Sequence, residues 1–500
     1  MKFKNKKVEE LYDYMSEMSK KAYSDPLLIS NDVLCKQDTR GKVLEAYLVG
    51  KTFKQRNFFF VTRKIVFYFL KNLTFFLLYL CIATAHKLSR QMFRLPANDE
   101  FVVLDTYFIA RGILEQGEFK DIYFPGLANA LEKKNKNYAY VPRLFGTLSP
   151  FKWFQIFRVL KKNGDPVLTE FQLLKYVDYL DMIRFIFLYP FSVGRFVKEL
   201  GTSHKDEILR RGLWQAFDGT TFMGYVRFLL GRRLSLLKNV KIKCFSWYEN
   251  QIFDKNFYRG LRVVRKKAHI VGAQFFVRPH FLLNIFADER EIVFDVLPDR
   301  ILVNGPGYLY KMESIQVDTG PSLRYKHLFS NEANPAAGSI ILILLPFFDP
   351  VVLHILKVVC EVDWPVPVEI KFHPGTDVRR YKKRILEKFL ITNKSLLELL
   401  PQARLVVGRS GGQLEAAALG IPVIDICPPE EFSQSYMPEM GKGVLWDQAV
   451  DTGSVTRLVT RFQKSLQFNS SLLKEEGARL RSMYFTNPTN DFINEAFQLD

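Results

Sequence analysis

The stretch RLVVGRSGGQLEAAALGIPVI, residues 404–424, contains a buried strand, a glycine turn, a short helix and a second strand in immediate succession. The apolar run LVV leads into the turn at residues 408–412, and the helix QLEAAAL ends at Gly420. A strand followed by a helix and another strand is the repeating unit of a parallel sheet. The sequence therefore predicts an α/β domain in this part of the chain.

The turn within this stretch is suited to hold a phosphate. Ser410, Gly411 and Gly412 leave backbone N–H groups at the start of the helix, and glycine lets a ligand approach the backbone closely. Glu415, in the first helical turn, can accept hydrogen bonds from ribose hydroxyls. The alternative is an ordinary strand-to-helix turn in which Ser410 caps the helix and Glu415 balances its dipole.

A second segment, VEIKFHPGTD at residues 368–377, ends a strand in a His-Pro pair. Strand ends of a parallel sheet share one edge, so His373 is expected at the same edge as the glycine turn. There an imidazole can donate to a phosphate oxygen, with Lys371 nearby, and Pro374 fixes the backbone that presents it. The alternative is a structural histidine followed by a loop proline.

Other apolar strings extend this pattern along the chain. Near-continuous apolar strands that alternate with helices indicate parallel sheets covered on both faces. We expect the α/β class, with two Rossmann-like αβα domains that face each other across a cleft. The predicted strands are residues 101–108, 138–144, 241–248, 268–276, 300–303, 339–345, 368–372, 405–407 and 423–426.

The predicted domains follow from these strings and from the turn cluster at residues 304–307, Asn-Gly-Pro-Gly. The first Rossmann-like domain carries a helical insertion, and the last helices are expected to pack back on the body of the protein. The predicted segments are an N-terminal extension at residues 1–98, a first domain at 99–305 with the insertion at about 151–237, a second domain at 306–470 and C-terminal helices at 471–500.

The extension contains a long apolar run, IVFYFLKNLTFFLLYLCIATA, at residues 65–85. The run is long enough to cross a bilayer, but basic residues flank both of its ends. A helix lying in the membrane interface, a spanning helix and a buried helix of a soluble domain all remain open. The in-plane arrangement is favoured by polar and aromatic residues that share one stripe: Lys64, Tyr68, Lys71, Asn72 and Tyr79.

The net charge and the cysteine content indicate which partners the protein binds and in which cellular compartment it is expected. The formal net charge of +19 favours an anionic partner, such as phosphorylated substrates or an anionic membrane surface. No nucleic-acid-binding pattern is found, so no nucleic acid is expected as a partner. The five scattered cysteines indicate reduced thiols, and the charged N-terminus predicts no secretory signal. We expect a cytoplasmic protein associated with the inner face of the plasma membrane.

The order IKFHP and then VVGRSGGQLEAAALGIPVI resembles the C-terminal half of GT-B glycosyltransferases that build bacterial surface carbohydrates, in capsule and lipopolysaccharide biosynthesis. That group is distantly similar to sialyl-, polysialyl- and Kdo-transferases. The segments at residues 245–262, 270–279, 297–308 and 317–328 agree with it. Two departures are Phe275, where such proteins often have a histidine that His280 could replace, and Gly411, where a second serine is common.

The resemblance implies a glycosyltransferase that moves a sugar from a nucleotide sugar, CMP- or UDP-linked, to a surface polysaccharide or lipid-linked glycan acceptor. A glycan or glycolipid acceptor and an anionic membrane would be the other partners. The donor site would comprise His373, Pro374, Lys371, Ser410, Gly411, Gly412 and Glu415, with Arg324 reaching the phosphates from the domain junction.

An inverting transfer needs a general base from the first domain. Glu118 resembles the residue of the Gly-Glu loop that carries the base in Kdo transferases. Asp105 and Glu249 are rivals because each ends a predicted strand, where this fold places active residues. The chain has no convincing metal-binding dyad and no His/Cys cluster, so neither a metal nor another cofactor is expected.

Two other functions remain open. A nucleotide-sugar 2-epimerase-like enzyme also places a Ser-Gly-Gly turn at a helix start. A noncatalytic nucleotide-sugar-binding scaffold of a polysaccharide assembly complex would tolerate the phenylalanine after Gln274.

Overall fold

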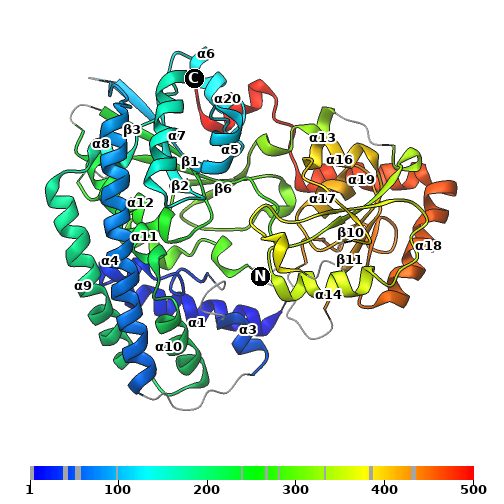
Figure 1. Ribbon diagram of the computed structural model, residues 1–500, viewed down its shortest axis with the longest axis horizontal. Helices are drawn as coiled ribbons and strands as arrows, with labels where there is room; N and C mark the ends of the chain where they lie inside the picture. Colours follow the sequence, from blue (N-terminus) through cyan, green and yellow to red (C-terminus); the bar gives the residue numbers. More distant parts are fainter. Residues whose placement is uncertain are drawn as a thin grey trace.

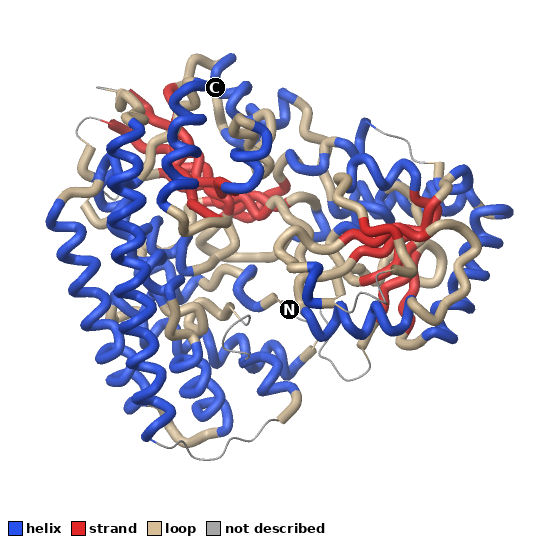
Figure 2. Tube along the Cα trace, in the orientation of Figure 1, coloured by secondary structure: helices blue, strands red, loops and turns tan. Residues whose placement is uncertain are grey.

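Two parallel six-stranded sheets form the centres of two αβα domains, which lie side by side in the molecule (Figures 1 and 2). This arrangement confirms the predicted α/β fold class, with two Rossmann-like αβα domains. The computed structural model describes residues 5–37, 43–50, 58–96, 99–237, 240–264, 268–279, 282–330, 334–381, 387–428 and 435–500.

The first sheet has the strand order β2-β1-β3-β4-β5-β6 with all neighbours parallel. Its central strand alternates between two cores, because Val102 and Leu104 face one side while Phe101 and Val103 face the other. The strands are β1 (Asp99–Ile109), β2 (Asn137–Phe145), β3 (Val240–Trp247), β4 (His269–Gln274), β5 (Arg300–Val303) and β6 (Gln316–Thr319).

Helices cover both faces of this sheet. One face carries α5 (Ala110–Gln116), α6 (Leu127–Lys133), α7 (Pro150–Asn163) and the last helix, α20 (Asn490–Phe497). The other face carries α12 (Ile252–Arg262) and the helical insertion between β2 and β3. The insertion begins at α8, later than the predicted residue 151, because α7 packs on the first face. The insertion comprises α8 (Glu170–Leu173), α9 (Tyr176–Glu199), α10 (His204–Gln215) and α11 (Gly219–Ser235).

The second sheet has the order β12-β11-β10-β7-β8-β9, again entirely parallel. One face packs on α14 (Asp349–Val359) and α18 (Thr452–Phe468), and the other on α17 (Gly412–Ala418) and α19 (Ser470–Tyr484). The strands are β7 (Ile340–Leu344), β8 (Val368–Lys371), β9 (Leu390–Ile391), β10 (Ala403–Gly408), β11 (Val423–Ile426) and β12 (Trp446–Ala449).

All nine predicted strands are found, and three further strands were not predicted: β6, β9 and β12. Each of the three lies at an edge of its sheet and is only two to four residues long. An edge strand is partly exposed and needs no continuous apolar run. β6, with the sequence QVDT, therefore carries no pattern that identifies it as a strand.

The boundary between the domains lies later than predicted. β6 pairs with β5 in the first sheet, so the chain leaves the first domain between Thr319 and Ile340 and not at residues 305 and 306. The glycines of the turn cluster serve close packing instead. A Cβ atom on Gly305 or Gly307 would lie 2.6 Å from Tyr484 of α19, which leaves no space for a side chain there.

The C-terminal helices cross between the two domains. α19 packs against α17 and α18 in the second domain, and α20 then returns to α6 at the top of Figure 1. There Phe497 is fully buried, with its ring 4.8 Å from that of Phe245 and 6.5 Å from that of Phe124.

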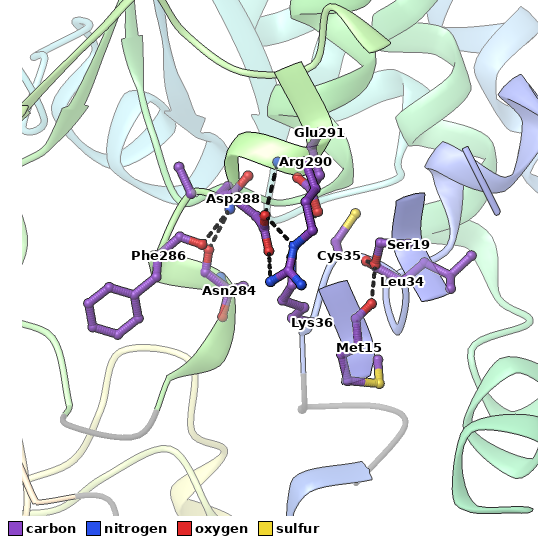
Figure 3. Close-up of polar contacts among 12 residues, drawn as sticks. Met15, Ser19, Leu34, Cys35, Lys36, Asn284, Phe286, Asp288, Arg290 and Glu291 are labelled. Carbon is purple, nitrogen blue, oxygen red and sulfur yellow. Dashed lines mark hydrogen bonds and ion pairs between the residues drawn. The ribbon is translucent and has the colours of Figure 1, made fainter. Parts of the chain in front are cut away.

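The N-terminal extension is part of the first domain and packs on its helical insertion. It comprises α1 (Lys6–Ala22), α3 (Val43–Leu48) and α4 (Phe58–Ser89). An ion pair fixes the segment after α1: Lys36 Nζ lies 2.8 Å from Oε1 of Glu291, and both side chains are fully buried. Figure 3 shows the residues around this pair. Lys255 of α12 binds the other oxygen of Glu291.

The apolar run forms α4, which is longer than predicted. Three members of the predicted polar stripe face the protein, and Lys64 and Lys71 line an open groove. Tyr68, Asn72 and Tyr79 are buried against the insertion. Asn72 donates to the carbonyl of Tyr68 at 2.9 Å, which satisfies a polar group inside the core. By length and composition α4 could cross a membrane, yet this inner stripe belongs to the core of the domain.

Two glycines hold the helical insertion against the rest of the first domain. Where α11 crosses α12, a Cβ on Gly231 would lie 2.4 Å from the carbonyl oxygen of Phe257, and a Cβ on Gly260 would lie 2.3 Å from that of Phe228. The helices are thus in backbone contact, which only glycine permits.

We expect Gly231→Ala to lower the free energy of unfolding by about 1–3 kcal/mol, because the added methyl group must push the two helices apart. Urea unfolding followed by circular dichroism measures this loss. Gly112→Ala in α5 is the matched control, since nothing lies within 4 Å of its Cβ position and alanine favours the helix. Equal stability of the two variants would show that the crossing tolerates separation.

Candidate functional site

The carboxyl ends of the two sheets meet at the domain junction. Val277, which follows β4, packs beneath Gly411, which follows β10: a Cβ on Gly411 would lie 3.5 Å from that of Val277. His327 Nε2, beyond β6, lies 3.1 Å from Oε2 of Glu415 in α17. Ligands of open parallel sheets bind beyond the carboxyl ends of the strands, so we expect a ligand-binding site at this junction.

The glycine turn is shaped by a residue that the sequence did not single out. The fully buried Gln413 accepts a hydrogen bond from the N–H of Ser410 at 3.1 Å. Its Nε2 donates to the carbonyls of Gly408 and Ile424, both at 3.0 Å. Because Gln413 occupies the N–H of Ser410, the predicted phosphate contact of Ser410 is left to its hydroxyl group.

The three glycines of the turn are under different constraints. Gly408 has φ +135°, and a Cβ there would lie 2.1 Å from the carbonyl oxygen of Leu344, so no other residue fits. A Cβ on Gly412 would press on Leu396 and Leu344 at 2.8 and 2.9 Å. Gly411 has an ordinary helical φ of −55°, and a Cβ there would make only normal contacts. The glycine at 411 is therefore not required by the fold.

His373 lies at the same edge of the second sheet as the glycine turn. Gly408, Leu344 and Lys371 lie in one row across the sheet, and Ser410 and His373 each follow that row by two residues. Within this row, Gly408 and Lys371 are two strand spacings apart, about 10 Å.

The protonation of His373 suits a hydrogen-bond donor. Nδ1 accepts from the N–H of Gly375 at 3.1 Å, so the neutral ring carries its proton on Nε2. Partial burial lowers the pKa of His373, which keeps the ring neutral at physiological pH. Its Nε2–H can therefore donate to an anion, and Pro374 follows it in the exposed loop.

The other donor-side residues are engaged with protein groups. Lys371 Nζ donates to the carbonyl of Lys394 at 2.5 Å, and burial lowers its pKa. Glu415, predicted to bind ribose, is mostly buried and lies against His327 as described above. Lys371 and Glu415 thus lie near the carboxyl edge of the second sheet, and each of them already contacts a protein group.

Glu249 lies at the carboxyl edge of the first sheet, beyond β3. Trp247 Nε1 donates to its Oε1 at 2.8 Å, and Gln251 Nε2 donates to its Oε2 at 2.7 Å. Burial raises the pKa of Glu249, and the nearby Asp254 raises it further. A positioned carboxylate with a raised pKa is what a general base requires.

Arg324 lies on the Glu249 side of the junction. Its guanidinium is 5.2 Å from the ring centre of Trp247 and 5.3 Å from that of Tyr123. The rings of Tyr123 and Trp247 are in edge contact with centroids 4.7 Å apart. An exposed cation held over two aromatic rings thus lies next to a carboxylate, on the side of the first domain.

Asp105 lies inside the first domain in a buried cluster of charges. Arg143 Nη2 and Arg227 Nη2 contact its two oxygens at 2.5 and 2.6 Å, and Arg143 also contacts Asp254 at 2.6 Å. Burial opposes the charged form of Asp105, but the two arginines outweigh it and hold its pKa below the ordinary value. Both carboxylate oxygens of Asp105 are paired with arginines, and the side chain has no exposed surface. These contacts indicate a role in stabilising the domain and not that of a general base.

Glu118 lies on the surface, after α5. It pairs with Lys120 at 2.7 Å, and its side chain is 49% exposed. The preceding carbonyl of Gly117 accepts from Asn163 at the end of α7. Of these two candidate bases, Glu118 is half exposed and paired with a lysine, and Glu249 is held by Trp247 and Gln251.

The residue that departs from the resembled pattern is a core side chain. Phe275 is fully buried and packs against Phe124 and Phe497, so its place is inside the hydrophobic core. Its predicted substitute, His280, lies outside the described residues.

Four residues of this region were missed by sequence reasoning: Gln413, Tyr123, Trp247 and His327. Gln413 directly follows the glycines, and its position could have identified it as the residue that closes the turn. The other three come from segments distant in sequence. In the described part of the chain, no group of three or more His, Cys, Asp or Glu side chains is arranged to hold a metal ion.

No family model and no curated protein matches this sequence. Several solved structures align with this chain at low identity and low TM-score. MurG of Acinetobacter baumannii is 11% identical, over 80% of this chain and 99% of its own, with a TM-score of 0.41. HepE of Anabaena in complex with UDP-glucose is 11% identical, over 80% and 98%, also with 0.41.

The UDP-GlcNAc 2-epimerase of Neisseria meningitidis, bound to UDP-GlcNAc, is 11% identical over 80% of this chain and 100% of its own, with a TM-score of 0.43. At such low similarity, no residue of this chain takes a role from these proteins.

We expect Asp105→Asn to destabilise the first domain by about 3–5 kcal/mol, because it leaves two buried arginines without their full counter-charge. Urea unfolding measures the loss. The pKa of Asp105 is lowered on folding, so the wild-type advantage is complete above the ordinary carboxyl pKa and shrinks as the pH falls below it. Asp181→Asn is the matched control, since its bond to Arg232 at 2.7 Å is partly exposed and worth less than about 1 kcal/mol.

Proposed function

We propose that the chain is a glycosyltransferase that moves a sugar from a nucleotide sugar to a glycan or glycolipid acceptor. One observation carries the proposal: a neutral histidine donor and an open glycine turn on one sheet edge lie across the junction from an enclosed carboxylate on the other. An anion-binding group and a base on facing edges are the two parts that such a transfer needs.

On the donor side, Nε2–H of His373 and the hydroxyl group of Ser410 bind the phosphates of the nucleotide. Gly411 lets the phosphates approach the backbone, which explains a glycine where the fold accepts a side chain. Hydrogen bonds from these groups stabilise the charge that develops on the leaving nucleotide. A CMP- or UDP-linked sugar is the proposed donor, with Glu415 on the ribose and Lys371 close to the phosphates.

On the acceptor side, Glu249 takes the proton from the attacking hydroxyl group. Trp247 and Gln251 hold its carboxylate in position, and the raised pKa increases its basicity. Arg324 over Tyr123 and Trp247 offers a cation to the phosphates or to the acceptor. Glu118 remains the rival base, and no metal or other cofactor takes part in the proposal.

The acceptor is proposed to be a surface polysaccharide or a lipid-linked glycan, made at the cytoplasmic face of the plasma membrane. Free thiols at all five cysteines support a reducing compartment.

Nucleotide sugars should raise the unfolding temperature of the wild-type chain, since a ligand at about 100 times its Kd adds about 2.7 kcal/mol of stability. A panel of CMP-, UDP-, GDP- and dTDP-sugars identifies the donor. Gly411→Ala and His373→Ala should lose this response while unfolding at the wild-type temperature without ligand. His204→Ala, on the exposed start of α10, is the matched control and should respond normally. The donor site is refuted if no nucleotide sugar gives a shift.

Glu249→Gln should lower kcat by about 10²–10⁴-fold while leaving donor binding intact, because the amide keeps the geometry but cannot accept a proton. For the wild type, activity should fall as the pH drops through the raised pKa of Glu249, since the base must be deprotonated. Glu118→Gln is the paired variant and should retain activity. Loss of activity in Glu118→Gln, with normal activity in Glu249→Gln, would identify Glu118 as the base.

The same assays separate the alternatives. A 2-epimerase would convert the bound nucleotide sugar without any acceptor. A noncatalytic scaffold would bind it and produce no reaction, and Glu249→Gln would then leave polysaccharide assembly unchanged.

A further inference from the structure

The outer face of α4 carries exposed apolar side chains from the first turns of the helix to its last. Its side chains alternate between the buried stripe described above and a second stripe that faces solvent. The exposed fractions run from 51% to 69% for Val66, Phe67, Leu70, Leu77 and Leu88. A contiguous apolar surface of this kind marks a site of interaction with a partner or a membrane.

The neighbouring helix α9 extends this surface. Tyr176, Leu180 and Phe191 are 91%, 65% and 68% exposed. The two helices are joined by the contact between Phe69 of α4 and Phe187 of α9, with ring centroids 5.5 Å apart. Figure 1 shows α4 and α9 next to each other on the side of the molecule away from the second domain. We call these two outer stripes the α4–α9 face.

Cations lie within this face. A groove of about 780 Å³ along the first half of α4 combines apolar side chains with Arg63, Lys64 and Lys71. At the other end of the helix, a hollow of about 680 Å³ brings Arg90 together with residues of α7. Those residues include Arg158, Lys161 and Lys162.

Acidic residues are scarce on the same helices. α4 contains no Asp or Glu in its 32 residues. In α9, Asp178 is buried against Arg232 and Arg233, and Asp181 also pairs with Arg232. Glu199, the last residue of α9, is exposed next to Lys198. The exposed charge of the face is therefore mainly positive, with Arg184 and Arg195 exposed on α9.

The packing of α4 determines how such a face can meet a bilayer. The helix packs on α7, α9 and α11, and its inner stripe belongs to the core of the first domain. His86 and Gln91, just past the apolar run, bond to each other at 2.9 Å inside the protein. Lipid cannot surround a helix that covers a protein core, so α4 can contact a bilayer with its outer stripe only.

We propose that the α4–α9 face docks on the surface of an anionic lipid bilayer, with α4 lying parallel to the membrane plane. The apolar stripe enters the interface, and the groove at Arg63 and Lys71 takes the phosphate of an anionic lipid head group. Arginine and lysine side chains at both ends of the helix bind head groups along its length.

Charge complementarity favours this occupant over a second copy of the chain. Pairing two copies through the same face would bring its cations against each other, and like charges across an interface are unfavourable. An anionic surface satisfies the apolar and the charged parts of the face together.

The test is flotation of the full chain with vesicles of phosphatidylcholine, with and without phosphatidylglycerol. The wild type should bind the anionic vesicles at least about tenfold more tightly, and added salt should weaken the difference. Arg63→Glu/Lys71→Glu should lose about tenfold or more in binding to anionic vesicles. Phe67→Ser/Leu70→Ser should lose binding to both kinds of vesicle, because it removes apolar side chains that enter the interface.

Arg457→Glu/Lys464→Glu on α18 is the matched control, since it makes the same change in net charge on exposed residues of the other domain. It should bind as the wild type does. Circular dichroism and thermal unfolding establish that all variants are folded, and the nucleotide-sugar response should be unchanged in each.

Equal binding of the wild type to neutral and anionic vesicles would overturn the proposal, as would variants of the face that bind normally. A wild-type dimer that Phe67→Ser/Leu70→Ser dissociates, with no vesicle binding, would instead assign the face to self-association. None of these outcomes depends on the proposed transferase activity, which is measured without vesicles.

Discussion

The first domain is organised around charges that have no access to water. Asp105 of β1 and Arg143 of β2 are joined by Arg227 of the insertion and Asp254 of α12, so four segments far apart in sequence meet at two carboxylates and two guanidinium groups. A buried charge is tolerated only when it is paired. Separating the insertion from the sheet would break the pair between Arg227 and Asp105 and leave buried charges without partners, at a large cost in folding free energy. The cluster also lies directly beneath the carboxyl edge, because Asp254 Oδ2 accepts from the backbone N–H of Glu249.

The residues on the two sides of the junction are held in place by different kinds of contact. In the first domain, the buried ion pairs lie beneath the Glu249 carboxylate. Arg324 lies beside it, over the rings of Tyr123 and Trp247. In the second domain, the glycine turn is held by the amide of Gln413. His373 is held by the N–H of Gly375 and by the ring of Phe347, 5.4 Å away between centroids. Defined positions for a base and for anion-binding groups suit a site where the acceptor must be aligned and the nucleotide must leave.

Sequence reasoning found the two-domain fold because central parallel strands are buried on both faces and read as unbroken apolar strings. It missed β6, β9 and β12 because edge strands lack that pattern, and the domain boundary moved with β6. At the site, His373 and the turn were recognisable from local spacing. The burial of Asp105, the aromatic support of Arg324 and the contact between His327 and Glu415 depend on segments that meet only in the folded chain.

The chain crosses between the domains twice, once after β6 and once after α19, when α20 returns to the first domain. Two covalent connections limit how far the domains can separate or turn relative to each other, and a single connection would limit them less. The first connection also carries Arg324 and His327, so part of the site is built from the crossing itself.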